Sequence, residues 1–327
     1  MKHLSITILL ILLTMTTKAQ TFYGSEPFAH TYSIVAYDEK TGEMGVAVQS
    51  HWFSVGSLVT WGEAGVGVVA TQSFVNPAFG PQGLALMKVG LSPKQALESM
   101  IAADEGRDVR QVALLNTKGE VAAHTGEKCI QAAGHIEGKH YSVQANMMLN
   151  DKVWGAMAKA FETTEAPLAE RMMAALEAAE SVGGDIRGKQ SAAILVVRGE
   201  STGKVWEDRL VDLRVEDHEN PIAEIKRVLK VHRAYEHMNK GDLAVEHGDM
   251  DLAMKEYVAA EEMFPENEEM KFWHAVTLVN NDRLKEALPI FKEVFTKNEN
   301  WKVLTPRLID SDLLKVSEED LKKILKQ

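Results

Sequence analysis

The sequence is poor in cysteine: Cys129 is the only one among 327 residues. A single cysteine excludes an internal disulfide and leaves no paired thiols for a metal or redox motif. It also leaves no cysteine behind the N-terminal segment for lipid attachment. We expect Cys129 to be a small buried hydrophobic residue rather than a nucleophile.

Basic charge is also scarce. The chain has 36 Lys and Arg against 47 Asp and Glu, for a net charge of −11. An acidic chain without a polybasic stretch is a poor match for nucleic acid, whose phosphates require a basic face. The eleven histidines form no His-Glu-x-x-His pattern and no paired Cys/His spacing. The sequence therefore predicts no nucleic-acid partner, no metal site and no cofactor.

Long hydrophobic runs are absent except for residues 6–15, which follow Lys2 and precede Ala19. This run of ten residues is too short to span a bilayer, which takes about 20 residues in a helix. A charged start, a short apolar run and a small residue are typical of an export signal. We expect residues 1–19 to be a signal peptide, residues 20–30 a short N-terminal segment, and the protein to be periplasmic or secreted without stable membrane insertion.

Charge is missing from a central stretch as well. Residues 41–87 contain no Lys, Arg or Asp, and only Glu43 and Glu63 are acidic. Such a stretch is mostly buried, because an unpaired charge is too costly inside a protein. It is either core sheet, or a buried sheet with an active site at one end. Its β-branched residues and glycines predict strands at 31–37, 44–50, 55–61 and 66–73.

The rest of the first domain alternates helices and strands. Ser92 and Pro93 mark a helix start, with Ser as N-cap and Pro in the first turn. Further strands are expected at 111–116, 120–124, 141–145, 191–197 and 205–213, and helices at 151–162 and 167–182. This order predicts an α+β domain over residues 31–215, with two sheets between helical layers.

After residue 221 the sequence becomes helical, charged and repetitive. Small and aromatic residues recur 34 positions apart: Gly241, Ala253, Tyr257, Ala260 and Pro265 become Ala275, Ala287, Phe291, Val294 and Glu299. This period resembles the tetratricopeptide repeat, a helix–turn–helix unit. Residues 222–327 are therefore expected to form an all-α helical-repeat domain. It either binds a protein partner or serves as an appendage that stabilises the first domain or makes a homo-oligomer.

Several ordered blocks carry a resemblance to a known family. They include TYSIVAYDEKTGEMGVAVQSHWFSVGS, NPAFGPQGLALM, EGRDVRQVAL, HTGEKC, YSVQANMM and GGDIRGKQSAAILVV. Together they resemble the domain-of-unknown-function 1028 family over residues 31–213. The resemblance implies the N-terminal-nucleophile (Ntn) hydrolase fold, a four-layer αββα sandwich.

In Ntn hydrolases the first residue of the first strand is the nucleophile, and the resemblance places Thr31 there. Its own α-amine would act as base. An α-amine has a pKa of about 7.7–8.0, against about 10.4 for Lys, so far more of it is unprotonated at neutral pH. Signal cleavage leaves about eleven residues ahead of Thr31. The mechanism therefore needs a second cut between His30 and Thr31, without which the amine is blocked.

A proteasome-like Ntn site would also use an Asp and a Lys from the next strands, and residues 41–87 contain neither. Any site is therefore of another type. Neutral donors suit an acyl-transfer oxyanion, and Asn146 beyond the strand at 141–145 is the catalytic candidate for that role. The alternative is that Asn146 is only a turn residue. His51 is a candidate proton relay, or else a core histidine with its hydrogen bonds satisfied.

Five further polar residues are candidates for substrate binding. Ser50, Gln72 and Ser73 end strands and are expected to line the cleft. Asp185 and Arg187 lie in a glycine-rich loop before a core strand and could orient a polar substrate. They could equally form a purely structural ion pair.

Two hypotheses follow from the sequence. The first is an exported Ntn-type amidohydrolase that acts on an amide bond of a small-molecule or peptide-like substrate, with Thr31 as nucleophile after processing. The alternative is a non-catalytic module that uses the Ntn-like domain and the helical repeats to bind a ligand or a protein.

Overall fold

The computed structural model describes residues 28–327. The predicted signal peptide and most of the segment 20–30 lie outside these residues. The chain divides into two compact units, the first ending at Ile225 and the second running from Lys226 to Gln327. The first is a mixed α+β unit with two antiparallel sheets, and the second is helical. No helix in residues 28–327 is long and apolar enough to cross a membrane.

The larger sheet contains the strand headed by Thr31. Its order is β11-β10-β3-β2-β9-β8, and all neighbouring strands are antiparallel. The strands are β2 (Thr31–Tyr37), β3 (Met44–Ser50), β8 (Gly134–Gly138), β9 (Tyr141–Ala145), β10 (Ser191–Val197) and β11 (Arg209–Val215). The central strands β2, β3, β9 and β10 are almost wholly buried, which explains why this part of the sequence carries so little charge.

The second sheet has the order β1-β5-β6-β7, and β4 also pairs with β5. Its strands are β1 (Phe28–Ala29), β4 (Thr60–Glu63), β5 (Gly67–Phe74), β6 (Arg110–Asn116) and β7 (Val121–Thr125). On one edge of β5, β4 pairs with residues 67–70, while β1 pairs with Ser73 and Phe74. The opposite edge of β5 pairs with β6.

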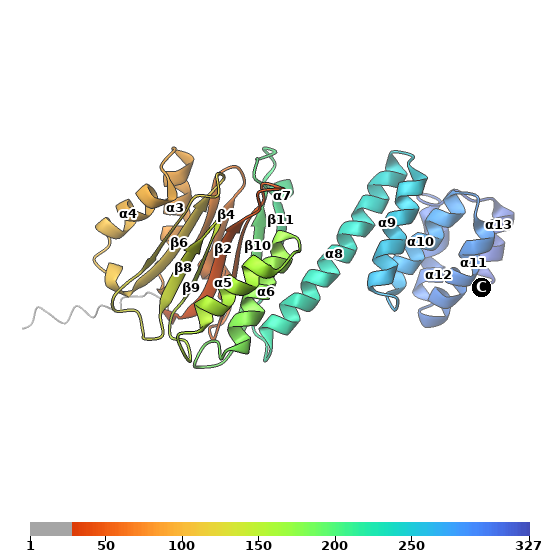
Figure 1. The fold of residues 1–327 in the computed structure, drawn as a ribbon. Helices are drawn as coiled ribbons and strands as arrows, with labels where there is room; N and C mark the ends of the chain where they lie inside the picture. The colour runs from red at the N-terminus through yellow and green to blue at the C-terminus, as the bar shows by residue number, and fades with distance from the viewer. Residues whose placement is uncertain (1–27) are drawn as a thin grey trace, which may run out of the picture. The chain divides into compact units, whose positions relative to one another are not determined.

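Apolar side chains from both sheets form one shared core between them. It contains residues of β2 and β3, such as Val35 and Val46, together with Val68 of β5 and Leu115 of β6. Helices α3 (Phe79–Lys88) and α4 (Pro93–Ala103) pack on the second sheet. Helices α5 (Val153–Thr163) and α6 (Leu168–Ser181) pack on the larger sheet, as Figure 1 shows for the first unit.

Most of the predicted strands are confirmed, and β2, β3, β9 and β10 have the expected bounds. The Ser92 helix start is also confirmed: its side chain accepts from Gln95 N and completes a capping box at α4. Two strand predictions are wrong at their first residues. Residues 56–59 form the helical turn α2 (Gly56–Val59), and residues 205–208 form α7 (Val205–Asp208) before β11.

The first residue of α2 must be glycine for a steric reason. A Cβ on Gly56 would lie 2.5 Å from Ala193 Cβ, so the chain approaches β10 too closely there for any larger residue. Thr60 Oγ1 then donates to Gly56 O at 2.8 Å and closes the turn. The sequence prediction also missed helix α3 and strand β8 altogether.

The second unit is built from consecutive helices. Helix α8 (Pro221–Glu246) begins within the first unit and is followed by α9 (Met250–Met263), α10 (Glu268–Asn280), α11 (Leu284–Lys297), α12 (Asn300–Leu304) and α13 (Glu318–Leu325). Helix α10 packs against both α9 and α11. Phe272 of α10 and Phe291 of α11 meet edge to face in the core of the second unit, with ring centroids 5.9 Å apart.

Two glycines in helices of the first unit provide a matched test of how tightly these helices pack on their neighbours. A Cβ on Gly80 of α3 would lie 2.2 Å from the Trp61 ring, whereas one on Gly155 of α5 would meet nothing within 4 Å. We predict that Gly80→Ala destabilises the protein by about 1–3 kcal/mol through overpacking. Gly155→Ala should stabilise it by up to about 1 kcal/mol through helix propensity. Calorimetric melting of the full chain checks both, and equal effects of the two substitutions would contradict the tight contact of α3 with Trp61.

Candidate active site around Thr31

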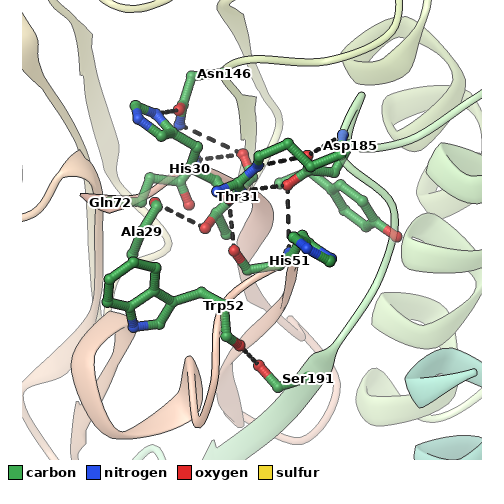
Figure 2. A network of polar contacts seen from close by, with 12 residues as sticks. Ala29, His30, Thr31, His51, Trp52, Gln72, Asn146, Asp185 and Ser191 are labelled. Carbon is green, nitrogen blue, oxygen red and sulfur yellow. Dashed lines mark hydrogen bonds and ion pairs between the residues drawn. The ribbon is translucent and has the colours of Figure 1, made fainter. Parts of the chain in front are cut away.

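Strand ends from both sheets meet at the start of β2. Because β2, β3 and β10 are antiparallel and in register, Thr31 lies beside Ser50, and Ser50 lies beside Ser191. The end of β9 lies on the other side of β2, so that Asn146 N donates to Thr31 O at 3.1 Å. Figure 2 shows the polar contacts that gather at this point. The fold thus brings residues distant in sequence around a single peptide group, His30–Thr31.

The carbonyl oxygen of His30 accepts two side-chain hydrogen bonds. Ser50 Oγ donates at 2.5 Å and Arg187 Nη2 donates at 2.7 Å. One donor comes from the end of β3, the neighbour of β2, and the other from the loop before β10. A peptide carbonyl held by a hydroxyl and a guanidinium is strongly polarised, since hydrogen bonds from charged donors are about twice as strong as neutral ones.

Asp185 fixes the position of Arg187. Its carboxylate accepts from Arg187 Nη2 at 2.7 Å and Nε at 3.0 Å, and also from the His51 backbone N at 3.3 Å. The Asp185 side chain is fully buried. The loop can turn this sharply because Gly183, Gly184 and Gly188 have φ angles of 121°, 55° and 109°. The pair is therefore more than a surface ion pair, since it aims a cation at the His30 carbonyl.

Thr31 itself is fully buried. Its Oγ1 donates to Ala29 O at 2.8 Å, so the hydroxyl points back toward the Ala29–His30 peptide. Its carbonyl also accepts from Gln72 Nε2 at 3.2 Å. The chain is continuous through His30, and in this form the Thr31 nitrogen is an amide rather than a free amine.

The His30 side chain is also buried, with 3% exposed. Its Nδ1 donates to Asn146 Oδ1 at 2.8 Å, and its ring meets Phe74 edge-on with centroids 5.3 Å apart. Burial lowers the pKa of His30 below its ordinary 6.5, and the Arg187 charge lowers it further. The Asn146 hydrogen bond and the Asp185 charge act in the opposite direction. The imidazole is therefore neutral at pH 7.

Buried amides tie the site to both sheets. Gln111 Oε1 accepts from Gln72 Nε2 at 2.6 Å and from Asn146 Nδ2 at 2.9 Å. Gln111 Nε2 donates to Ala145 O at 2.9 Å, and Ser33 Oγ donates to Gln72 Oε1 at 2.6 Å. A satisfied network of this kind stiffens its surroundings, because each displaced group would lose a partner in a low-dielectric interior.

Six of the eight candidate residues lie within this cluster: Thr31, Ser50, Gln72, Asn146, Asp185 and Arg187. The side chain of His51 is exposed, and only its backbone N–H reaches Asp185. Ser73 is buried with φ +74°, and its hydroxyl makes no hydrogen bond to nitrogen or oxygen. It lies beside the Cys129 thiol, whose pKa is raised by burial and lowered somewhat by Ser73.

The sequence interpretation missed four residues of the cluster: His30, Ser33, Gln111 and Gln144. Gln144 Nε2 donates to Ser33 Oγ at 2.6 Å. A usable signal did exist, because Gln111 and Gln144 are amides within otherwise apolar strands, and His30 directly precedes the candidate nucleophile. Within residues 28–327 no three His, Cys, Asp or Glu side chains gather where they could share a metal ion.

Comparisons with known proteins place this domain. The model of the Family of unknown function (DUF1028) matches residues 31–225. A crystal structure of a DUF1028 protein from Silicibacter pomeroyi is 30% identical, with a TM-score of 0.57, covering 62% of this chain and 85% of that one. Anbu, the ancestral beta-subunit from Yersinia bercovieri, is 14% identical, with a TM-score of 0.30, covering 60% of this chain and 92% of that one. A TM-score of 0.30 is too low for the likeness to Anbu to carry an argument. None of the curated proteins compared matches. The chain belongs to the Family of unknown function (DUF1028).

Proposed function

We propose that the protein is an exported Ntn-type amidohydrolase whose nucleophile, Thr31, is freed by cleavage of the His30–Thr31 peptide. The observation that carries this proposal is the pair of donors on the His30 carbonyl, Ser50 Oγ at 2.5 Å and Arg187 Nη2 at 2.7 Å. Donors at these distances from a carbonyl oxygen are the arrangement that stabilises a tetrahedral oxyanion. They contact the carbonyl of the His30–Thr31 peptide, the one bond whose cleavage would free the Thr31 amine.

The cleavage step follows from the chemistry of these groups. Thr31 Oγ1 bonds to the His30 carbonyl carbon, the C–N bond breaks, and the hydroxyl proton passes to the departing nitrogen. Water then hydrolyses the resulting ester, which leaves a carboxylate on His30 and a free amine on Thr31. Ser50 and Arg187 stabilise the negative charge on the carbonyl oxygen in both steps.

Turnover of a substrate repeats the same chemistry in trans. The Thr31 amine takes the proton of its own hydroxyl, and the oxygen attacks the substrate amide carbonyl in the place vacated by His30. The leaving amine receives that proton, and water hydrolyses the acyl-enzyme. Asp185 and Arg187 supply a carboxylate and a cation from the loop before β10. The strands within residues 41–87, where a proteasome-like site would place its Asp and Lys, contain neither residue. This chemistry needs no metal or cofactor.

The architecture of the first unit supports the proposal. Two sheets share one core, and each has helices on its other face, which fits the four-layer αββα sandwich that Ntn hydrolases share. We extend the proposal to the second unit as two tetratricopeptide-like repeats that bind a protein partner. The support is that equivalent positions are buried in both: Ala253, Tyr257 and Ala260, then Ala287, Phe291 and Val294.

The first test is the mass of the purified protein. We predict a species that begins at Thr31, retained in Thr31→Ser and lost in Thr31→Ala. Ser50→Ala removes one oxyanion donor and should slow the cut by about 10²–10³-fold. Ser99→Ala is the matched control, since Ser99 is an exposed residue of α4. A chain that always retains His30, or a cut that survives Thr31→Ala unchanged, would contradict self-processing.

The second test is covalent labelling of the cut chain with an alkyne-tagged β-lactone, which acylates a nucleophilic hydroxyl. Label is expected on Thr31. Because the amine acts as base only when unprotonated, the labelling rate should rise with pH through the α-amine range, about 7.7–8.0 when unperturbed, and then level off. Peptide mapping that finds the label on other residues, or a rate independent of pH, would count against the assignment.

A non-catalytic binding module is the second candidate. It is favoured by one observation: residues 41–87 contain neither the Asp nor the Lys that a proteasome-like Ntn site would use. In that case the uncut protein is the final form, and it is neither cut nor labelled at Thr31. The mass and labelling measurements therefore separate the two functions.

A further inference from the structure

The segment just before Thr31 sits where a substrate would have to bind. Resting on the proposed function, we infer that residues 28–30 occupy the acyl side of the active site in the manner of a substrate. The substrate class that this implies is an extended peptide, cleaved after a residue whose side chain is a planar, uncharged hydrogen-bond donor such as histidine. Three sets of contacts support the inference, one for each part of such a substrate.

The first set is made by the backbone. Strand β1 pairs antiparallel with the end of β5, with Phe28 opposite Phe74 and Ala29 opposite Ser73. Strand β4 pairs with residues 67–70 of that edge, which leaves residues 71–74 to β1 or to another extended chain. Addition of an extended peptide to a sheet edge is a general mode of peptide recognition, in which main-chain hydrogen bonds supply the affinity.

The second set surrounds the His30 side chain. Asn146 Nδ2 donates to Gln111 Oε1 at 2.9 Å, and this fixes the amide so that Oδ1 accepts from His30 Nδ1. The Phe74 ring stands edge-on against the imidazole at 5.3 Å. A fixed acceptor beside an aromatic ring favours a planar side chain that donates a hydrogen bond. It disfavours an aliphatic side chain, which would leave Asn146 Oδ1 unpaired.

The third set holds the carbonyl. His30 O receives Ser50 Oγ and Arg187 Nη2, the same two donors that the proposed chemistry needs. Residues 28–30 thus make strand-edge, side-chain and carbonyl contacts in the order in which a peptide substrate would make them. Release of the segment after cleavage would leave all three open to a second peptide.

The test uses the full-length protein after its own processing. N-acetyl-Phe-Ala-X amides of 7-amino-4-methylcoumarin, with X as His, Gln, Leu or Glu, are compared by kcat/KM. Each reaction consumes one water and releases the acetyl tripeptide and the aminocoumarin. We expect the His substrate to exceed the Leu substrate by about tenfold or more, because a site built to hydrogen-bond a side chain rejects analogues that lack the donor.

Asn146→Leu should bring the His/Leu ratio close to one. Asn116→Leu is the matched control at the far end of β6, where Asn116 donates to Glu120, and it should leave the ratio unchanged. Should Asn146→Leu fail to fold, the substrate series on the unmodified protein still decides the question. Free N-acetyl-Phe-Ala-His should also slow β-lactone labelling of Thr31.

The outcomes separate this inference from the proposed function. Labelling at Thr31 without any preference for His, or without competition from the tripeptide, overturns the subsite assignment and leaves the hydrolase intact. It would mean that residues 28–30 are only an anchor for the N-terminal segment. Absence of both the cut and the label overturns the proposed function, and the inference falls with it.

Discussion

The structure around Thr31 depends on amides that are buried between two sheets and must find partners there. Gln111 is the centre of this constraint, since its side chain joins Gln72, Asn146 and the Ala145 carbonyl. Loss of one partner would leave another group unsatisfied, at a cost of about 1–3 kcal/mol. The requirement fixes the ends of β5, β6 and β9 relative to each other. The geometry at Thr31 is thereby set by the fold itself.

Arg187 illustrates how a charge is used at such a site. An isolated cation would be costly to desolvate, and Asp185 offsets part of that cost through two hydrogen bonds. Nη2 of Arg187 also donates to the His30 carbonyl. Replacing the pair with apolar residues could preserve stability, as it does for many buried ion pairs, but it would remove the only side-chain cation that contacts this carbonyl among residues 28–327.

The sequence predicted the central strands well because residue type and lack of charge both indicate a buried strand. β2 and β3 are rich in β-branched, small and aromatic residues, free of charge inside their bounds, and buried except for the partly exposed Tyr37. Residues 55–61 look equally strand-like, yet residues 56–59 form the turn α2, where only glycine fits beside Ala193, and that contact is invisible in the sequence. Helix α3 was missed because its N-cap, Ala78, offers no side-chain hydrogen bond.

The same distinction applies to the candidate site. Ser50 and Asn146 could be named from strand ends, because antiparallel pairing brings such ends together, whereas Thr31 was named from the family resemblance. The bond from Arg187 to His30 spans 157 positions and requires three glycines with positive φ, so only the folded loop reveals it. The His30–Asn146 contact, across 116 positions, could not be read from spacing either.

The division of the β5 edge between two short strands has a consequence for solubility. Unpaired strand edges promote association between molecules, and proteins avoid leaving long ones exposed. Departure of β1 would uncover only Ser73 and Phe74, since β4 still covers residues 67–70. The positive φ of Ser73 also interrupts the extended backbone at that point. The protein could therefore release β1 without exposing a long unpaired strand edge to other protein molecules.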